Sequence, residues 1–192
     1  KDVEAGGGSL RADDLAAYEA LEIEAFSRDY GGGTVHAPPG MTAGPTMMHV
    51  LDQIEGRIGK GTPGAEAFEA YATALSAAYA ARFETMGDPD DSADPTCTTH
   101  LTVIDGKGSM VSLTQTLLSS FGSKVVLPTT GILMNNGILW FDPLPDRPNS
   151  LKPGKRPLSN MCPVVVTKGD QPWFAVGASG GRRIMPAVMQ IV

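Results

Sequence analysis

Cysteine is scarce in this chain, with Cys97 and Cys162 the two present among 192 residues. Two thiols give neither the repeated spacing of a disulfide framework nor the paired spacing of a zinc site. A single disulfide would satisfy the count, but we expect two free thiols. Histidine is nearly as scarce, and His36, His49 and His100 are too scattered to suggest a shared metal. We therefore predict no metal site and no cofactor.

Long apolar runs and basic blocks are also missing. No stretch approaches the roughly 18 uninterrupted apolar residues of a membrane span, and the opening Lys1–Glu4 does not have the pattern of a signal peptide. The net charge is −6 and the basic residues form no long block, which argues against a nucleic-acid partner. We expect an acidic soluble protein, whose location is not readable from these residues.

The residues that are present suit one globular domain of ordinary size. Hydrophobic residues make up 42% of the chain and charged residues 19%, which is typical of a chain with a single core. The 23 glycines and 15 prolines predict many turns and prominent loops.

Three helices are predicted in the first half of the chain. Ser9 is expected to cap a short one, Thr46 a second, and Thr62 a third that has Pro63 in its first turn. In the third helix the aromatic stripe is expected to be a packing face, ending at Gly87. Apolar residues at helical spacing support the three: Leu10, Leu15 and Tyr18; Met47, Val50, Leu51 and Ile54; Phe68, Tyr71, Leu75, Tyr79 and Phe83.

The second half of the chain has the period of strands. The acidic segment Pro89–Pro95 is expected to be an exposed loop in front of them. A helix is expected to begin after Arg183. Helices followed by hairpin-connected strands predict an α+β fold. The predicted strands are 98–104, 110–117, 131–134, 164–167 and 173–176, with turns at 105–108 and 168–170.

The run Thr98–Ile104 begins with Thr-Thr-His. Its β-branched composition predicts a strand, whether or not the run also has a catalytic role. A threonine hydroxyl inside a chain is a poor nucleophile that needs a neighbouring base. A free α-amino group has an unperturbed pKa of about 7.7 to 8.0. Cleavage between Cys97 and Thr98 would therefore place nucleophile and base on one residue.

This run and the residues spaced after it resemble the gamma-glutamyltransferases, amidases of the N-terminal nucleophile class. The resemblance implies a four-layer αββα sandwich, with two sheets face to face and helices outside. It also implies that residues 1–97 form the end of a large subunit and residues 98–192 the start of a small subunit within one sandwich domain, so we expect a fragment of a longer precursor. The residues that carry it are Thr98–Ile104, Gly108, Ser109, Val111, Thr114, Thr116, Phe121 and Gly122, with Gly7–Leu10, Pro38–Pro39, Tyr79–Arg82 and Met86–Pro89 upstream.

The same resemblance implies catalytic roles. Thr98 would be the nucleophile and the Cys97–Thr98 bond the site of autocatalytic cleavage. Thr116 would be the threonine that hydrogen-bonds the nucleophile and assists cleavage. Gly180 and Gly181 would supply the backbone N–H groups of an oxyanion hole, although a Gly-Gly pair alone predicts only a turn.

The same resemblance implies part of the substrate-binding site. Arg156–Met161 resembles a segment whose paired serines hold the α-carboxylate of a glutamyl group. Ser159 retains the first serine, and Asn160 could still donate in place of the second.

Three positions depart from the family pattern, and all three bear on which acyl group the site would bind. Leu118 stands where an asparagine is usual, and Gly137 and Trp140 stand where a glutamine and an aspartate would hold the substrate ammonium. A buried site without a carboxylate for that cation discriminates against it. Trp140 and Leu118 therefore predict a less polar or differently shaped acyl pocket, which Gly137 and Trp140 are expected to border.

Three functions stay open. The first is a self-processing γ-glutamyl amidase, with water or an amine as acceptor. The second is a relative acting on a non-glutamyl amide, such as a cephalosporin or oxamate, and the third is a non-processing binding module. Bacterial members of the family are often exported, so both the periplasm and the cytoplasm remain open.

Overall fold

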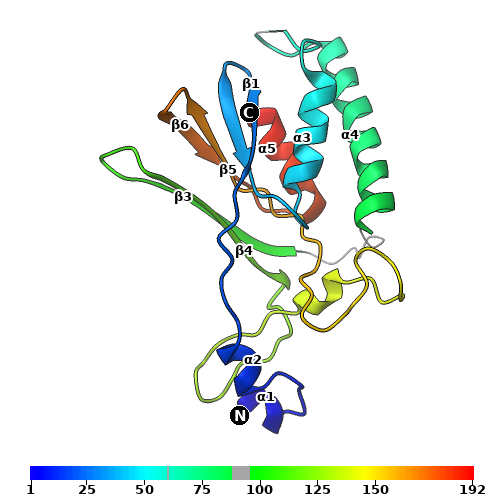
Figure 1. Ribbon diagram of the computed structural model, residues 1–192, viewed down its shortest axis with the longest axis vertical. Coiled ribbons are helices and arrows are strands. Elements are labelled where there is room, and N and C mark those ends of the chain that lie inside the picture. Colours follow the sequence, from blue (N-terminus) through cyan, green and yellow to red (C-terminus); the bar gives the residue numbers. More distant parts are fainter. Residues whose placement is uncertain (60, 88–95) are drawn as a thin grey trace.

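The structure is a computed structural model that describes residues 1–59, 61–87 and 96–192. The acidic loop predicted at Pro89–Pro95 lies outside the described residues. Helices and strands form separate layers, and the first 25 residues reach away from them as an extended arm (Figure 1).

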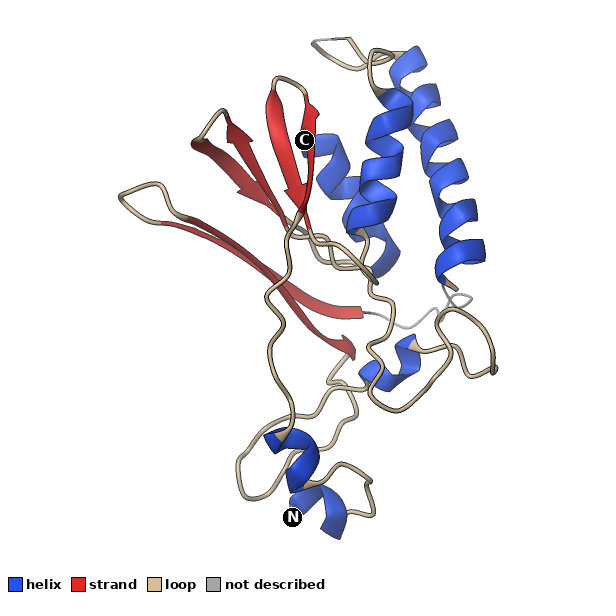
Figure 2. Ribbon diagram, in the orientation of Figure 1, coloured by secondary structure: helices blue, strands red, loops and turns tan. Residues whose placement is uncertain are grey.

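A four-stranded antiparallel sheet forms the centre of the fold (Figure 2). Its order is β1-β2-β5-β6, so strands from the two ends of the chain meet where β2 pairs with β5. The register there joins Val35 to Val166. The strands are β1 (Phe26–Tyr30), β2 (Gly33–Ala37), β5 (Val164–Lys168) and β6 (Gln171–Val176).

A second sheet is the two-stranded antiparallel ribbon of β3 (Thr96–Ile104) and β4 (Met110–Ser119). Asp105 closes its turn by accepting from the N–H groups of Lys107 and Ser109, both at 2.8 Å. The backbone hydrogen bond from Ser109, the largest cause, and that from Lys107 lower the pKa of the Asp105 carboxyl. The ribbon contacts β5 and β6 and lies away from the helices (Figure 1).

Three helices cover the face of the central sheet that carries Val35, Val164 and Val166. These helices are α3 (Gly44–Ile54), α4 (Ala65–Met86) and α5 (Ile184–Ile191). Alternate residues of β2 and β5 are buried against them, as expected for strands with one covered face. The α+β expectation is confirmed, and this layer order of helices, sheet and ribbon is the part of a sandwich that the chain provides.

The packing face of α4 differs from the predicted aromatic stripe. Tyr71, Leu75 and Tyr79 pack against the core, but Phe68 and Phe83 are exposed. Small side chains instead let α4 approach α3 closely. The buried residues of α4 are Ala67, Ala70, Ala74, Ala78 and Arg82.

Three predicted caps and one predicted strand are wrong. Ala43 and Gly64 occupy the N-cap positions of α3 and α4, whereas Thr46 is buried inside α3. Instead of a helix capped by Ser9, the arm contains two short helices, α1 (Asp2–Ala5) and α2 (Ala12–Ala16). The segment 131–134 is a loop with a single bridge, between Leu133 and Val126.

Candidate active site

Thr98 lies near the start of β3 and faces Thr116 of β4. The two residues are register partners, and the Thr98 hydroxyl donates to Thr116 Oγ1 at 3.2 Å. The register shifts between Thr96 and Thr98, as in a β-bulge, a device that re-aims side chains in a strand. Cross-strand pairing thus places the two hydroxyls in contact.

The Thr116 hydroxyl also contacts the backbone of both strands. It donates to the Cys97 carbonyl at 3.0 Å and accepts from the Leu118 N–H at 2.9 Å. A hydroxyl has one hydrogen and two lone pairs. The Thr116 hydrogen is donated to the Cys97 carbonyl, and the two lone pairs of Thr116 Oγ1 accept from Thr98 and Leu118.

The chain leaves β4 through a turn held by Asn136. Leu118 and Phe121 have φ values of 74° and 60°, which non-glycine residues seldom adopt. Asn136 Oδ1 accepts from the Ser119 N–H at 3.0 Å, and Asn136 Nδ2 donates to Ser119 Oγ at 2.8 Å. The Asn136 N–H donates to the Leu117 carbonyl at 3.1 Å. Asn136 had no predicted role, since a lone asparagine in a loop predicts only a turn.

Gly137 and Trp140 begin and end the 3-10 helix η1 (Gly137–Trp140), which follows Asn136 directly. Between them Ile138 and Leu139 are 61% and 63% exposed. An apolar turn therefore lies beside the end of the strand that carries Thr116.

A buried asparagine connects η1 to the Ser159 segment. Asn149 Nδ2 donates to the Trp140 carbonyl at 2.6 Å, and Asn149 Oδ1 accepts from the Leu158 N–H at 2.9 Å. Asn149 is fully buried and packs against Gly87 at the end of α4. This link was not predicted, because its two contacts come from loops with no periodic pattern.

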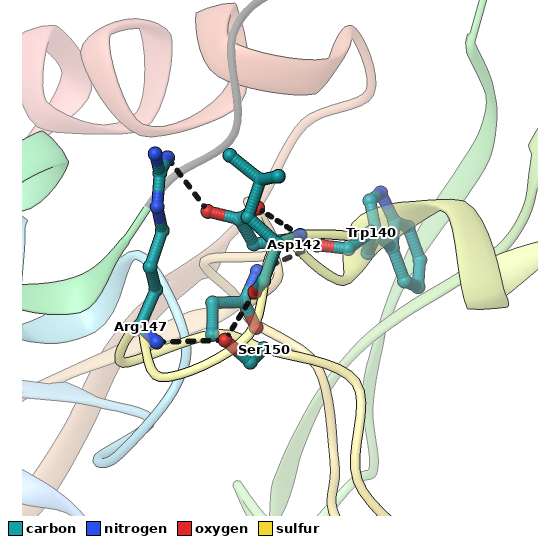
Figure 3. A network of polar contacts seen from close by, with 6 residues as sticks. Trp140, Asp142, Arg147 and Ser150 are labelled. Atoms are coloured by element: carbon teal, nitrogen blue, oxygen red, sulfur yellow. Dashed lines mark hydrogen bonds and ion pairs between the residues drawn. The ribbon is translucent and has the colours of Figure 1, made fainter.

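The loop between these residues is braced by a polar network (Figure 3). The buried Asp142 carboxylate accepts from Arg147 Nη1 at 3.2 Å and from the Leu144 N–H at 2.9 Å. Ser150 Oγ accepts from the Arg147 N–H at 2.8 Å and donates to the Leu144 carbonyl at 2.6 Å. The network fixes the loop that follows Trp140.

Ser159 and Asn160 lie in the loop before β5 and are held by α4. Arg82 Nη2 donates to the Ser159 carbonyl at 2.9 Å and to Asn160 Oδ1 at 3.0 Å. The Ser159 N–H donates to the Met41 carbonyl at 2.9 Å, and Ser159 is buried. Arg82 belongs to the Tyr79–Arg82 run, but the run itself did not indicate this contact.

Gly180 and Gly181 lie at the start of the short 3-10 helix η2 (Gly181–Arg183), which leads into α5. Their φ values are 132° and 58°, conformations that favour glycine. Just before them, a Cβ on Gly177 would stand 2.1 Å from His100 Cε1, so the glycine allows the segment to pack on the histidine ring. His100 follows Thr98 by two residues and shares its face of β3.

His100 is itself held by hydroxyls. Its Nδ1 is 2.8 Å from Thr114 Oγ1, and its Nε2 is 3.1 Å from Thr102 Oγ1. Burial lowers the pKa of His100, which favours the neutral ring. The predicted residues therefore form three groups: Thr98 with Thr116, Gly137 with Trp140, and Ser159 with Asn160. Gly180 and Gly181 form a fourth segment, which reaches the ribbon where Gly177 packs on His100.

The two cysteines are free, as expected. Cys97 is exposed and Cys162 is buried, where desolvation raises the pKa of its thiol to about 12. Within residues 1–59, 61–87 and 96–192, no group of three or more metal-ligating acidic, histidine or cysteine side chains occurs. None of the helices in that part of the chain is long and apolar enough to span a bilayer.

The chain is similar to known proteins along its whole length. The family model of gamma-glutamyltranspeptidase matches residues 1–97 and 91–192. The glutathione hydrolase proenzyme of Escherichia coli (strain K12) is 32% identical over 100% of this chain and 42% of its own length. An acylase ACY 1 proenzyme of Pseudomonas sp. (strain SE83) is 32% identical over 98% of this chain and 40% of its own length.

Among solved structures, the cephalosporin acylase from Bacillus halodurans superposes with a TM-score of 0.85 at 28% identity, covering 98% of this chain and 40% of that one. The chain thus spans about two-fifths of the length of these relatives.

Proposed function

Since this chain belongs to the gamma-glutamyltranspeptidase family, we propose that it provides the nucleophile of a self-processing amidohydrolase, and that the nucleophile is Thr98. The observation that carries the proposal is the pair of contacts made by Thr116, one to the Thr98 hydroxyl and one to the Cys97 carbonyl. Nucleophile and scissile carbonyl are thus held by one hydroxyl.

Cleavage follows from this arrangement. Thr98 Oγ1 attacks the Cys97 carbonyl carbon while its hydrogen passes to Thr116 Oγ1, and the Thr116 hydrogen passes along its own hydrogen bond to the carbonyl oxygen, which prevents negative charge from building on that oxygen. The C–N bond to Thr98 then breaks as the hydroxyl proton of this tetrahedral intermediate moves to the departing nitrogen. The ester that remains is hydrolysed by water. The products are a carboxylate on Cys97 and a free α-amino group on Thr98.

The freed amine then serves the second reaction. It accepts the Thr98 hydroxyl proton as the oxygen attacks the substrate amide, and returns a proton to the departing amine. The N–H groups of Gly180 and Gly181 stabilise the oxyanion. Water or an acceptor amine resolves the acyl-enzyme.

The decisive experiment compares intact masses of the parent protein, Thr98→Ala and Thr99→Ala after storage. We expect two fragments joining between Cys97 and Thr98 in the parent and in Thr99→Ala, and an unbroken chain in Thr98→Ala. Thr99 is the matched control because it neighbours Thr98 but is exposed on the other face of β3. An unbroken parent would overturn self-processing and favour a binding module.

For the acyl group we propose two candidates. A γ-glutamyl amide is the first, in line with the relatives named glutathione hydrolase. The exposed Ile138 and Leu139 of η1 favour a less polar acyl group, in line with the relatives named acylase. Relative kcat/KM for a γ-glutamyl anilide and for an aliphatic acyl anilide of equal length decides between them.

A further inference from the structure

Helix α4 contacts both loops that the proposed reaction needs, and it does so from the part of the chain before Thr98. Tyr79, Arg82 and Phe83 lie on one face of the helix, at the spacing that brings side chains together. The helix lies alongside α3 on the helical side of the central sheet, and its last turn ends near the loops that follow β4 (Figure 1).

The first contact fixes the Ser159 loop. Arg82 is 2% exposed and uses both terminal nitrogens: Nη2 on the Ser159 carbonyl and Asn160 Oδ1, and Nη1 on the Thr42 carbonyl at 2.9 Å and Thr46 Oγ1 at 3.2 Å. A planar guanidinium makes such divergent bonds in one fixed geometry, which an ammonium group does not reproduce. The bond to Asn160 also sets which way that amide faces.

The second contact fixes the glycine turn. Tyr79 Oη donates to the Arg182 carbonyl at 2.5 Å, within η2. The Arg182 guanidinium lies over the Phe83 ring, 5.1 Å from its centroid. Since Arg182 follows Gly180 and Gly181, the backbone orientation of both glycines depends on where η2 is held.

We propose that Arg82 and Tyr79 are positioning residues with separate tasks: Arg82 orients the Ser159–Asn160 loop for acyl-group recognition, and Tyr79 orients the Gly180–Gly181 turn for oxyanion stabilisation. The kinetic part rests on the proposed function. The structural part, that each side chain orders its own loop, does not.

Steady-state kinetics test the kinetic part. Arg82→Lys is expected to raise KM about tenfold with kcat nearly unchanged, because substrate binding depends on the loop. Tyr79→Phe is expected to lower kcat about three- to tenfold with KM nearly unchanged, the effect of losing one hydrogen bond. Arg82→Met should raise KM further than Arg82→Lys, which keeps the charge and part of the bonding.

Thr85→Ala is the matched control. Thr85 lies on the same helix, but its hydroxyl donates to the Ala81 carbonyl within α4 and reaches neither loop. Its kcat and KM should equal those of the parent. If both variants change both constants alike, or change neither, the separate tasks are refuted.

Hydrogen–deuterium exchange tests the structural part without any activity. Arg82→Lys should speed exchange in peptides covering 157–162 and spare 180–184, and Tyr79→Phe should do the reverse. Equal loosening of both segments, or none, overturns the proposal. A parent that neither cleaves nor hydrolyses amides would overturn the proposed function, while the exchange pattern would still decide whether the two side chains order their loops.

Discussion

The Thr116 hydroxyl uses every hydrogen-bonding position it has, on Thr98, Cys97 and Leu118. The Thr98 hydrogen therefore points at Thr116, which leaves the lone pairs of Thr98 Oγ1 for the proposed attack. Removing the Thr116 hydroxyl takes a hydrogen-bond partner from both the proposed nucleophile and the Cys97 carbonyl.

We predict that Thr116→Val slows cleavage at Cys97–Thr98 by about 10²-fold, the scale on which losing one oxyanion donor acts. Thr116→Ser, which keeps the hydroxyl, should cleave at a rate close to that of the parent. Thr114→Val is the control, since Thr114 lies two residues before Thr116 on the same face of β4 but contacts His100 instead of Thr98. The time course of intact mass measures all four proteins, and fast cleavage in Thr116→Val would remove Thr116 from the mechanism.

The two thiols should differ in reactivity. Cys162 is fully buried, and its pKa of about 12 leaves almost no thiolate at neutral pH, whereas Cys97 is exposed. Iodoacetamide should add one group to the native protein, at Cys97, and a second only after denaturation. Peptide mass mapping locates each adduct, and Cys97→Ser should take up none while native. Labelling of native Cys162 would contradict its burial.

At the scale of elements, the buried stripe of α4 consists of alanines except for Arg82 near its end, and these small side chains allow the helix to lie close to its neighbours. Ala74 is fully buried. Ala74→Leu should lower the free energy of unfolding by about 1–3 kcal/mol through overpacking. Phe68→Ala, at a site 58% exposed, should change it by about 0.5 kcal/mol or less. Urea denaturation measures both, and the opposite order would restore the aromatic stripe as the packing face.

Residue patterns located helices α3 and α4, the start of α5 and the strands β3 to β6. In α3, α4 and β5 the pattern follows a buried face, and in β3 it follows the β-branched composition. The hairpin of β1 and β2 was missed although Gly31-Gly32 between Tyr30 and Gly33 is a hairpin signal. Its buried face consists of Gly33, Val35 and Ala37, side chains too small to make apolar alternation visible. The cap predicted at Thr46 is wrong because its hydroxyl accepts a hydrogen bond from Arg82 inside α3, a tertiary contact that overrides local preference.

The candidate site divides in the same way. Thr98, Thr116 and the glycine pair were predicted from motifs that resemble the family's, and their catalytic roles stay predictions. Arg82, Asn136 and Asn149 were not predicted, because their partners lie in segments without a periodic pattern and, for Arg82, 77 residues away in the sequence.

At the scale of the whole molecule, the central sheet is built from both sides of the proposed cleavage point. β2 lies before it and β5 after it, and their pairing crosses the middle of the core. We predict that the two cleavage products elute together from gel filtration under native conditions and separate only in denaturant. Mass analysis of the eluted peak provides the check, and separate native peaks would refute it.

The pairing of β2 with β5 also makes folding easier before cleavage than after it. A single chain brings these strands together at the modest cost of closing a loop, whereas two separate pieces must find each other in solution. After cleavage, the melting temperature depends on the protein concentration. If the cleaved protein is unfolded and then diluted, its two pieces stay apart. If the proposed cleavage occurs, a paired set of cleavage products therefore implies that the chain folded before it was cut.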